Sequence, residues 1–189
     1  MVRFTITALV TAILISATAV AEVDFTPRES FYLAEATRVP NVSFRNESVD
    51  VTYSPPGSWI LSGGGRKLTL TPPNKVQAEA SMRTEPMKDP MPATDENIKA
   101  YGERAVALIP REASKVVLVE VGPAPLKVCL QPLIQATLTY VLFGQQFTTT
   151  IYFLPYKKEQ ITFQFTARNA DFQALAKDFR ASLFSLQGL

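Results

Sequence analysis

The chain has 189 residues, of which 47% are hydrophobic and 19% are charged, and its formal net charge is +2. This length and apolar content suit one domain whose core is large enough to be stable without disulfide bonds. The longest basic runs are the pairs Arg66-Lys67 and Lys157-Lys158, which excludes a dense nucleic-acid-binding surface. The chain has no histidine, so the usual general base near neutral pH and the commonest metal ligand are absent.

Residues 1–21 have the pattern of a secretory signal peptide. One basic residue precedes an apolar run from Phe4 to Ile15, and Ala19-Val20-Ala21 supplies the small residues that signal peptidase requires. A membrane-spanning helix needs about 20 apolar residues, which is more than this run offers. We therefore expect cleavage between Ala21 and Glu22, and a secreted or periplasmic mature protein with no stable membrane insertion.

The single cysteine, Cys129, lies far from the predicted cleavage site. It therefore cannot be the lipidated cysteine of a lipoprotein, and with no second cysteine it cannot form an internal disulfide. We expect a buried, unreactive thiol.

Residues 22–45 are the least regular part of the mature sequence, and we interpret them as an N-terminal extension of a domain over 46–189. A short helix over 29–36 fits the pattern, confined by Pro27 and Pro40.

From residue 48 onward, apolar and polar residues alternate with a period of two, as in half-buried strands. Residues 116–121 are instead a continuous β-branched run, which is typical of a central strand covered on both faces. The expected strands are 48–53, 58–61, 67–70, 76–83, 116–121, 136–143, 145–154 and 159–167. Short links join most of them, so the sheet should be mostly antiparallel.

Two helices interrupt or close this series of strands. The first is expected over 94–109, where apolar residues recur at offsets of three and four before Pro110. The second is expected to be capped by Asn169 and to carry Phe172, Leu175, Ala176, Phe179 and Leu183 on one face. This spacing predicts that the last helix packs on the sheet.

The order of these elements over residues 46–187 resembles the PsbP-like superfamily. The residues that carry the resemblance are Tyr53-Ser54-Pro55-Pro56-Gly57-Ser58-Trp59, Ala167-Arg168-Asn169-Ala170-Asp171-Phe172, Phe179, Leu183 and Ser185. The resemblance implies an α+β fold, an α/β/α sandwich with a central, mostly antiparallel sheet of about six to eight strands and two main helices. It also implies an accessory binding protein, and it carries over no catalytic motif.

Residue patterns that could support catalysis or metal binding are weak throughout the chain. Ser114-Lys115 are adjacent only in sequence, and Glu85 and Asp89 lie in a proline-rich loop where a fixed geometry is not expected. Gly63-Gly64-Gly65 precedes a strand and lacks the helix N-terminus of a phosphate-binding loop. We therefore predict a non-enzyme with no catalytic residues, no cofactor and no metal.

Two polar rows on the last two strands suggest a surface for a partner. We predict a non-catalytic extracytoplasmic binding or accessory protein with an unknown protein partner and no nucleic acid. The residues of this candidate surface are Thr148, Thr150, Thr162 and Gln164, extended by Gln160 and Thr166. The alternative explanation of the same rows, and the more ordinary one, is a solvated face made of good β-formers.

Met87 and Met91, in the 85–92 loop, are candidates for an adaptable rim of this surface, or for loop packing. The alternative function is a carrier that holds a small apolar ligand in a pocket between sheet and helices.

Overall fold

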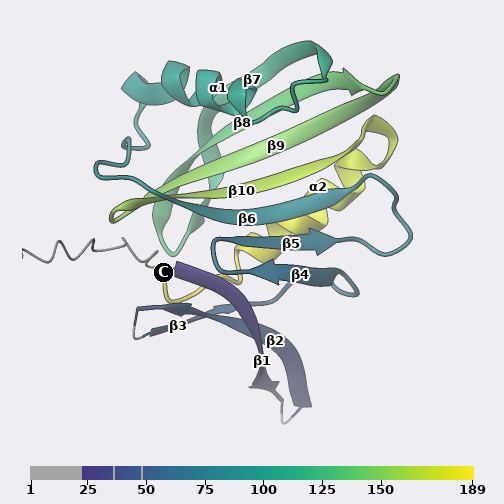
Figure 1. Ribbon diagram of the computed structural model, residues 1–189. Helices are drawn as coiled ribbons and strands as arrows, with labels where there is room; N and C mark the ends of the chain where they lie inside the picture. The colour runs from purple at the N-terminus through teal and green to yellow at the C-terminus, as the bar shows by residue number, and fades with distance from the viewer. Residues whose placement is uncertain (1–22, 36, 48) are drawn as a thin grey trace, which may run out of the picture.

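The computed structural model describes residues 23–35, 37–47 and 49–189. The predicted signal peptide and its cleavage site, Ala21–Glu22, lie outside the described residues. Within the described part of the chain, ten strands form two antiparallel sheets, and two α-helices flank the larger sheet (Figure 1). The predicted α+β class with a mostly antiparallel sheet is confirmed.

The smaller sheet has three strands in the order β1-β2-β3, and the larger has seven in the order β4-β5-β6-β10-β9-β8-β7. The bounds of the smaller sheet are β1 (Val23–Ala34), β2 (Thr37–Asn46) and β3 (Val49–Tyr53). Those of the larger are β4 (Ile60–Gly64), β5 (Lys67–Thr71), β6 (Glu79–Pro86), β7 (Ser114–Val128), β8 (Gln131–Leu142), β9 (Gln145–Tyr156) and β10 (Glu159–Arg168). The helices are the short η1 (Asp95–Asn97), α1 (Ile98–Ala107) and α2 (Asn169–Leu183).

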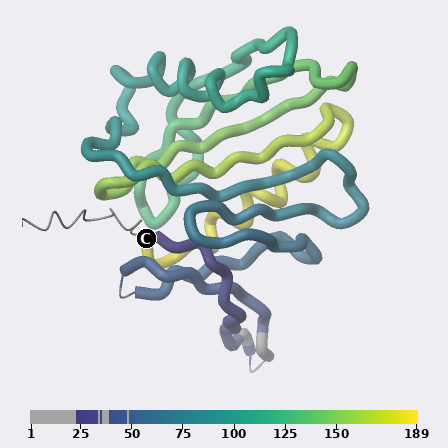
Figure 2. The backbone as a smooth tube through the Cα atoms, viewed as in Figure 1, coloured from purple at the N-terminus to yellow at the C-terminus, as the bar shows by residue number. Residues whose placement is uncertain are grey.

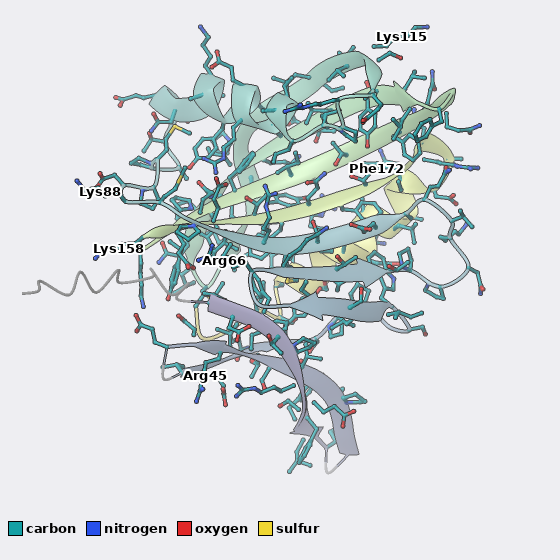
Figure 3. The ribbon with its side chains drawn as sticks, in the orientation of Figure 1. Arg45, Arg66, Lys88, Lys115, Lys158 and Phe172 are labelled. Atoms are coloured by element: carbon teal, nitrogen blue, oxygen red, sulfur yellow. The ribbon has the colours of Figure 1, made fainter. Side chains whose placement is uncertain are left out.

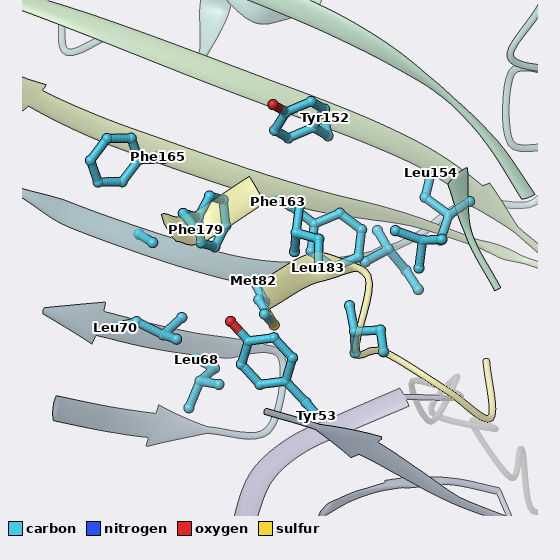
Figure 4. Packing of buried hydrophobic residues seen from close by; sticks show 14 of the residues in the cluster. Tyr53, Leu68, Leu70, Met82, Tyr152, Leu154, Phe163, Phe165, Phe179 and Leu183 are labelled. Atoms are coloured by element: carbon cyan, nitrogen blue, oxygen red, sulfur yellow. The ribbon is translucent and has the colours of Figure 1, made fainter. Parts of the chain in front are cut away.

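The two α-helices pack on opposite faces of the seven-stranded sheet, which makes it the middle layer of the predicted α/β/α sandwich. Helix α1 lies against β7 and β8, whereas α2 lies against β9 and β10. Because side chains alternate along a strand, β9 supplies Ile151 and Phe153 to the core beneath α1, and Tyr152 and Leu154 to the core beneath α2. Figure 4 shows the second of these cores, where Phe179 and Leu183 meet the sheet.

The predicted sheet-facing side of α2 is confirmed, because Phe172, Phe179 and Leu183 are buried and Leu175 and Ala176 are partly buried against the same core. Asn169 is the first residue of the helix and not its cap, which is Arg168. The ring of Phe179 stacks on that of Trp59, with centroids 6.4 Å apart and planes within 8° of parallel. The ring of Phe165 in β10 also contacts the ring of Phe179, with centroids 5.9 Å apart. One aromatic cluster therefore joins the segment before β4 to strand β10 and helix α2.

The helix expected over 29–36 is wrong, because the described residues of this segment belong to the β1–β2 hairpin. Phe31 pairs with Pro40 and Tyr32 with Val39. The backbone of this segment is therefore paired with β2, whereas in a helix it would form hydrogen bonds within the segment itself. Pro40 lies beyond the last β2–β3 pair, Val42↔Tyr53, so its missing N–H interrupts no ladder on that side. The hairpin projects from the body of the molecule (Figure 2).

The expectation of a central strand over 116–121 is also wrong. This segment belongs to β7, which is an edge strand, and Val117 and Val119 are 53% and 60% exposed. Its register with β8 shifts three times, and such bulges disrupt the regular edge that would otherwise attract another strand.

The end of the chain returns to the smaller sheet. Thr52 and Gln187 exchange two backbone hydrogen bonds of 3.0 and 3.1 Å, and the amide of Asn46 donates to the carbonyl oxygen of Gly188 at 3.2 Å. The C-terminus consequently lies beside the start of β1 (Figure 1). None of the helices in the described ranges has the length and apolarity needed to cross a membrane.

Candidate functional site

Helix α1 covers only part of its side of the sheet. It packs on β7 and β8, which leaves the other half of this face, over β5, β6 and β10, without a helix (Figure 1). We call this uncovered surface the open face. Seven residues line a cleft of about 200 Å³ on it: Lys67, Glu79, Ser81, Arg83, Thr162, Gln164 and Thr166.

Strand register places these side chains together. Arg83 of β6 lies between its cross-strand partners Lys67 of β5 and Thr162 of β10. Residues directly opposite each other in adjacent strands point to the same face, so the three side chains form one row. The alternate residue Met82 is buried in the core beneath α2, which explains why polar and apolar residues alternate along β6.

A second cleft, of about 400 Å³, adjoins the first and shares Arg83 with it. Together the two clefts have four cationic side chains, Arg66, Lys67, Arg83 and Arg104, and two carboxylates, Glu79 and Glu85. The labelled basic residues Arg66, Lys88 and Lys158 lie at the same end of the molecule (Figure 3). This part of the surface is therefore suited to a ligand with negative charge.

Ion pairs neutralise some of these charges. Arg104 lies 2.6 Å from Glu85, and Lys67 lies 3.7 Å from Glu79. Arg83 forms no salt bridge with any residue in the described part of the chain. Its guanidinium can therefore receive a carboxylate from outside the protein in the bidentate geometry that arginine favours.

A hydrogen-bond network fixes the polar side chains at the β9 border of the open face. The hydroxyls of Thr149 and Thr166 are 2.7 Å apart, and the side-chain amide of Gln164 lies 3.4 Å from each of them. Thr149 also donates to the carbonyl oxygen of Phe165 at 3.0 Å. The orientation of Gln164 is thus set before any partner binds.

The predicted candidate residues do not all share this face. Thr162 and Gln164 lie on the open face, but Thr148 and Thr150 point to the opposite side, toward α2. The reason is the two-residue turn after β9, which pairs Tyr156 with Glu159. Even-numbered residues of β9 therefore lie opposite odd-numbered residues of β10, and the prediction that the two threonine rows are adjacent is wrong.

The threonines also differ from the prediction in their exposure, because Thr148, Thr150 and Thr162 are all buried. Thr148 donates a hydrogen bond of 2.7 Å to the side chain of Asn169 at the start of α2. Thr150 lies 3.3 Å from the hydroxyl of Thr137. These contacts give both residues a structural role in the described chain.

The 85–92 loop is tethered between the β9–β10 turn and α1. The amide of Met87 donates to the carbonyl oxygen of Lys158 at 2.7 Å, and Arg104 contacts the Met87 sulfur at 3.7 Å. The hydroxyl of Tyr101 donates to the carbonyl oxygen of Met91, whose side chain packs against the core beneath α1. Met91 therefore packs against the core beneath α1, whereas Met87 contacts Arg104 beside the second cleft.

Tyr101 is the residue of this region with the clearest electrostatic perturbation. Burial raises its pKa to about 12, an effect that the positive charge of Arg104 partly opposes. The phenol is consequently a neutral hydrogen-bond donor at every physiological pH.

Metal-ligating side chains do not cluster in the described ranges: no group of three or more Cys, Asp or Glu residues is placed to hold an ion. Cys129 is half-buried, with its sulfur 3.3 Å from the carbonyl oxygen of Leu186.

Sequence reasoning did not identify Lys67, Glu79 and Arg83 as parts of the site. The alternation of apolar and polar residues around them correctly predicted that they lie in strands. The pairing of β6 with β10, which brings them to Thr162 and Gln164, joins segments about 80 residues apart and has no local signal.

Comparison with known proteins gives matches among solved structures only. No protein-family model matches the chain, and no curated protein matches it. A Pseudomonas aeruginosa protein of unknown function matches with a TM-score of 0.47 and 9% identity, over 85% of this chain and 97% of that one. The solution structure of cyanobacterial PsbP (CyanoP) from Synechocystis matches with a TM-score of 0.47 and 11% identity. The match covers 74% of this chain and 86% of that one.

Proposed function

We propose that this chain is an exported, non-catalytic binding protein that docks a protein partner on its open face. The observation that carries the proposal is the half-sheet that α1 leaves uncovered. On it Arg83 forms no salt bridge with a described residue and lies among polar side chains whose positions are fixed. A surface that served only to meet solvent would not need the hydrogen-bond network of Gln164.

The chemistry of the open face favours an acidic and polar partner surface. Arg83 can bind a carboxylate, and the neighbouring Gln164 can exchange hydrogen bonds with a peptide or amide group. A stable complex of ordinary size would bury about 800 Å² on each partner, which requires contacts across β5, β6 and β10 together. Charge complementarity would mainly set the rate of association and the choice of partner.

Packing in the sandwich favours this proposal over an apolar-ligand carrier. Such a carrier needs an enclosed apolar pocket between sheet and helices. Aromatic rings occupy both layers instead: Tyr101 meets Phe153 at 5.1 Å beneath α1, and Phe165 meets Phe172 at 5.6 Å beneath α2.

Export rests on the signal-like residues 1–21, and it is tested separately from docking. Intact mass and N-terminal sequencing of protein secreted by the native host should give Glu22 as the first residue. Recovery of full-length chain from the membrane fraction would contradict the extracytoplasmic assignment.

Docking is tested by placing a photo-crosslinking residue at Gln164 in the native host, with the same residue at Lys177 on the exposed side of α2 as the matched control. We expect a discrete crosslinked product from position 164 only. Arg83→Glu should abolish that product while the melting temperature stays within about 2 °C, since surface substitutions change stability little. Lys177→Glu, an equal change of charge on the far side, should leave the product intact. Equal crosslinking from both positions, or a product insensitive to Arg83→Glu, would place the partner elsewhere.

A further inference from the structure

The outer side of the three-stranded sheet carries a third cleft, which is separate from the open face. Its volume is about 490 Å³, within the range of roughly 300–1,000 Å³ that small-molecule sites occupy. It lies between the β1–β2 hairpin and the segment after α2, which runs beside β3 (Figure 1). Six of its eight lining residues have neutral hydrogen-bonding side chains: Ser30, Asn41, Thr52, Ser54, Ser185 and Gln187.

Strand pairing brings these side chains to one face. Ser30 is the cross-strand partner of Asn41, and Thr52 forms a β-bridge with Gln187. Residues directly opposite each other in adjacent strands point to the same face. Val51, the neighbour of Thr52, points the other way and is fully buried. The cleft is therefore the polar side of a sheet whose apolar side belongs to the core.

Hydrogen bonds fix the orientation of the Asn41 amide. Its Oδ1 atom accepts from the backbone N–H of Val42 at 2.9 Å and from the hydroxyl of Ser54 at 3.3 Å. Because both bonds use the oxygen, the two N–H groups of the amide are left as donors. The Ser54 oxygen, which gives its proton to Asn41, keeps lone pairs that can accept. A donor and an acceptor therefore lie side by side in the cleft.

Thr52 and Gln187 add further groups of both kinds. Their backbones bond to each other, whereas no hydrogen bond within the described part of the chain engages their side chains. A hydroxyl and a primary amide can each donate and accept. Ser185 differs, because its hydroxyl accepts from the Ser54 N–H at 2.8 Å and donates to the Ser182 carbonyl oxygen at 2.6 Å. It therefore holds Ser54 in place and is already satisfied.

The cleft also has an aromatic wall and no charge. Tyr32 is one of its lining residues and is 46% exposed, and none of the eight lining residues is ionised near neutral pH. The face of an aromatic ring can pack against the C–H groups of a sugar ring. Each sugar hydroxyl is both a donor and an acceptor, which matches the amide and hydroxyl groups of the cleft. An ionic ligand would find no counter-charge among these residues.

We propose that this third cleft binds a neutral saccharide, either a free sugar or a unit of a polysaccharide. Tyr32 packs against the sugar ring, while Asn41 and Ser54 bond to one pair of adjacent hydroxyls. Thr52 and Gln187 bond to hydroxyls on the side of the C-terminal segment. The site shares no residue with the clefts of the open face, so it is a second function that does not depend on partner docking.

The proposal is tested by titrating the purified protein with maltose, cellobiose and N,N′-diacetylchitobiose, followed by saturation-transfer difference NMR. We expect saturable binding of at least one of these neutral disaccharides. Tyr32→Ala should weaken that binding at least about tenfold, and Gln187→Ala about three- to tenfold, as for the loss of one hydrogen bond. No binding of any of the three disaccharides would overturn the proposal.

Matched controls change the same kinds of residue outside the cleft. Phe143→Ala removes an exposed aromatic ring from the β8–β9 turn, and Gln173→Ala removes an exposed amide from α2. Both should leave the affinity unchanged. Equal losses from the control and cleft substitutions would overturn the proposal.

Asn41→Asp tests the orientation of the amide. The variant keeps an oxygen for Val42 and Ser54 but replaces the two N–H donors with a second oxygen. It should abolish binding of the same disaccharide while the melting temperature stays within about 2 °C. Retained affinity would overturn the proposed site.

The source of the sugar is distinguished by retention on insoluble starch, cellulose and chitin, the polymers that correspond to the three disaccharides. Retention that Tyr32→Ala abolishes assigns a polysaccharide, and binding of the disaccharide without retention assigns a free sugar. Retention that Tyr32→Ala leaves unchanged would overturn the proposal.

Discussion

The hydroxyl of Tyr53, at the end of β3, lies 2.7 Å from the hydroxyl of Ser182 in the last turn of α2. Both side chains are buried, and this contact links the three-stranded sheet to the helix that packs on the seven-stranded one. Ser182 has a second partner, because its hydroxyl also lies 2.7 Å from the carbonyl oxygen of Phe179.

This asymmetry predicts that the two hydroxyls are not equivalent. Tyr53→Phe leaves Ser182 bonded to Phe179 and should lower the free energy of unfolding by about 1 kcal/mol. Ser182→Ala leaves the phenol of Tyr53 buried without its partner and should cost more, about 1–3 kcal/mol. Urea unfolding of both variants measures the difference, and a larger loss for Tyr53→Phe would contradict this assignment of donors and acceptors.

Phe179→Ala should be among the most damaging single substitutions. Its ring contacts Trp59 and Phe165 and is 1% exposed, so its removal leaves a cavity inside the aromatic cluster. We expect a loss of about 3–5 kcal/mol in the free energy of unfolding, together with a change in the fluorescence of Trp59. Phe184→Ala, at an exposed site one turn further along, is the matched control and should cost less than about 1 kcal/mol. Equal effects of the two substitutions would mean that α2 does not pack as described.

Tyr101 should make the folded protein less stable as the pH rises into the alkaline range. Its pKa is raised by burial to about 12 in the folded protein, whereas an unfolded tyrosine titrates near about 10. Below pH 10 both states are neutral and the group contributes no pH dependence. Between about pH 10 and 12 the unfolded chain loses the proton first, so the folded state is progressively destabilised.

Tyr101→Phe isolates this effect. At pH 8 the variant should be less stable than the wild type by about 1 kcal/mol, because the hydrogen bond to the Met91 carbonyl oxygen is lost. At pH 11 the deficit should shrink by roughly 1 kcal/mol, since the variant lacks the ionisable phenol. Unfolding free energies at the two pH values measure the change, and a constant deficit would show that Tyr101 titrates normally.

Local patterns predicted most strands and helices well. They predicted less well which strands are neighbours in the sheet and which face each side chain occupies. The alternation in 145–154 and 159–167 identified β9 and β10 almost to their ends, because a period of two and a tight turn are local signals. The face that Thr150 occupies depends on the register across that turn, and a difference of one residue moves the side chain to the opposite face.

The errors elsewhere have a similar origin. The β1–β2 hairpin exposes Phe31, Tyr32 and Leu33, so its residues lack the apolar–polar alternation that marks a half-buried strand. For β7, an apolar run indicated burial, but the run lies at an edge where aliphatic side chains are exposed. Arg83 was correctly predicted to lie in a strand. Its position in the candidate site could not be predicted, because it depends on the pairing of β6 with the distant strand β10.

The closure of the chain end on the smaller sheet has a consequence for the order in which the protein can fold. Strands β1 to β3 are synthesised before the other strands and helices, yet Tyr53, Thr52 and Asn46 find partners in residues 182–188, which are synthesised much later. The smaller sheet must therefore remain incompletely bonded until nearly the whole chain has been synthesised. Because these contacts span well over a hundred residues, their formation should be among the latest events in folding.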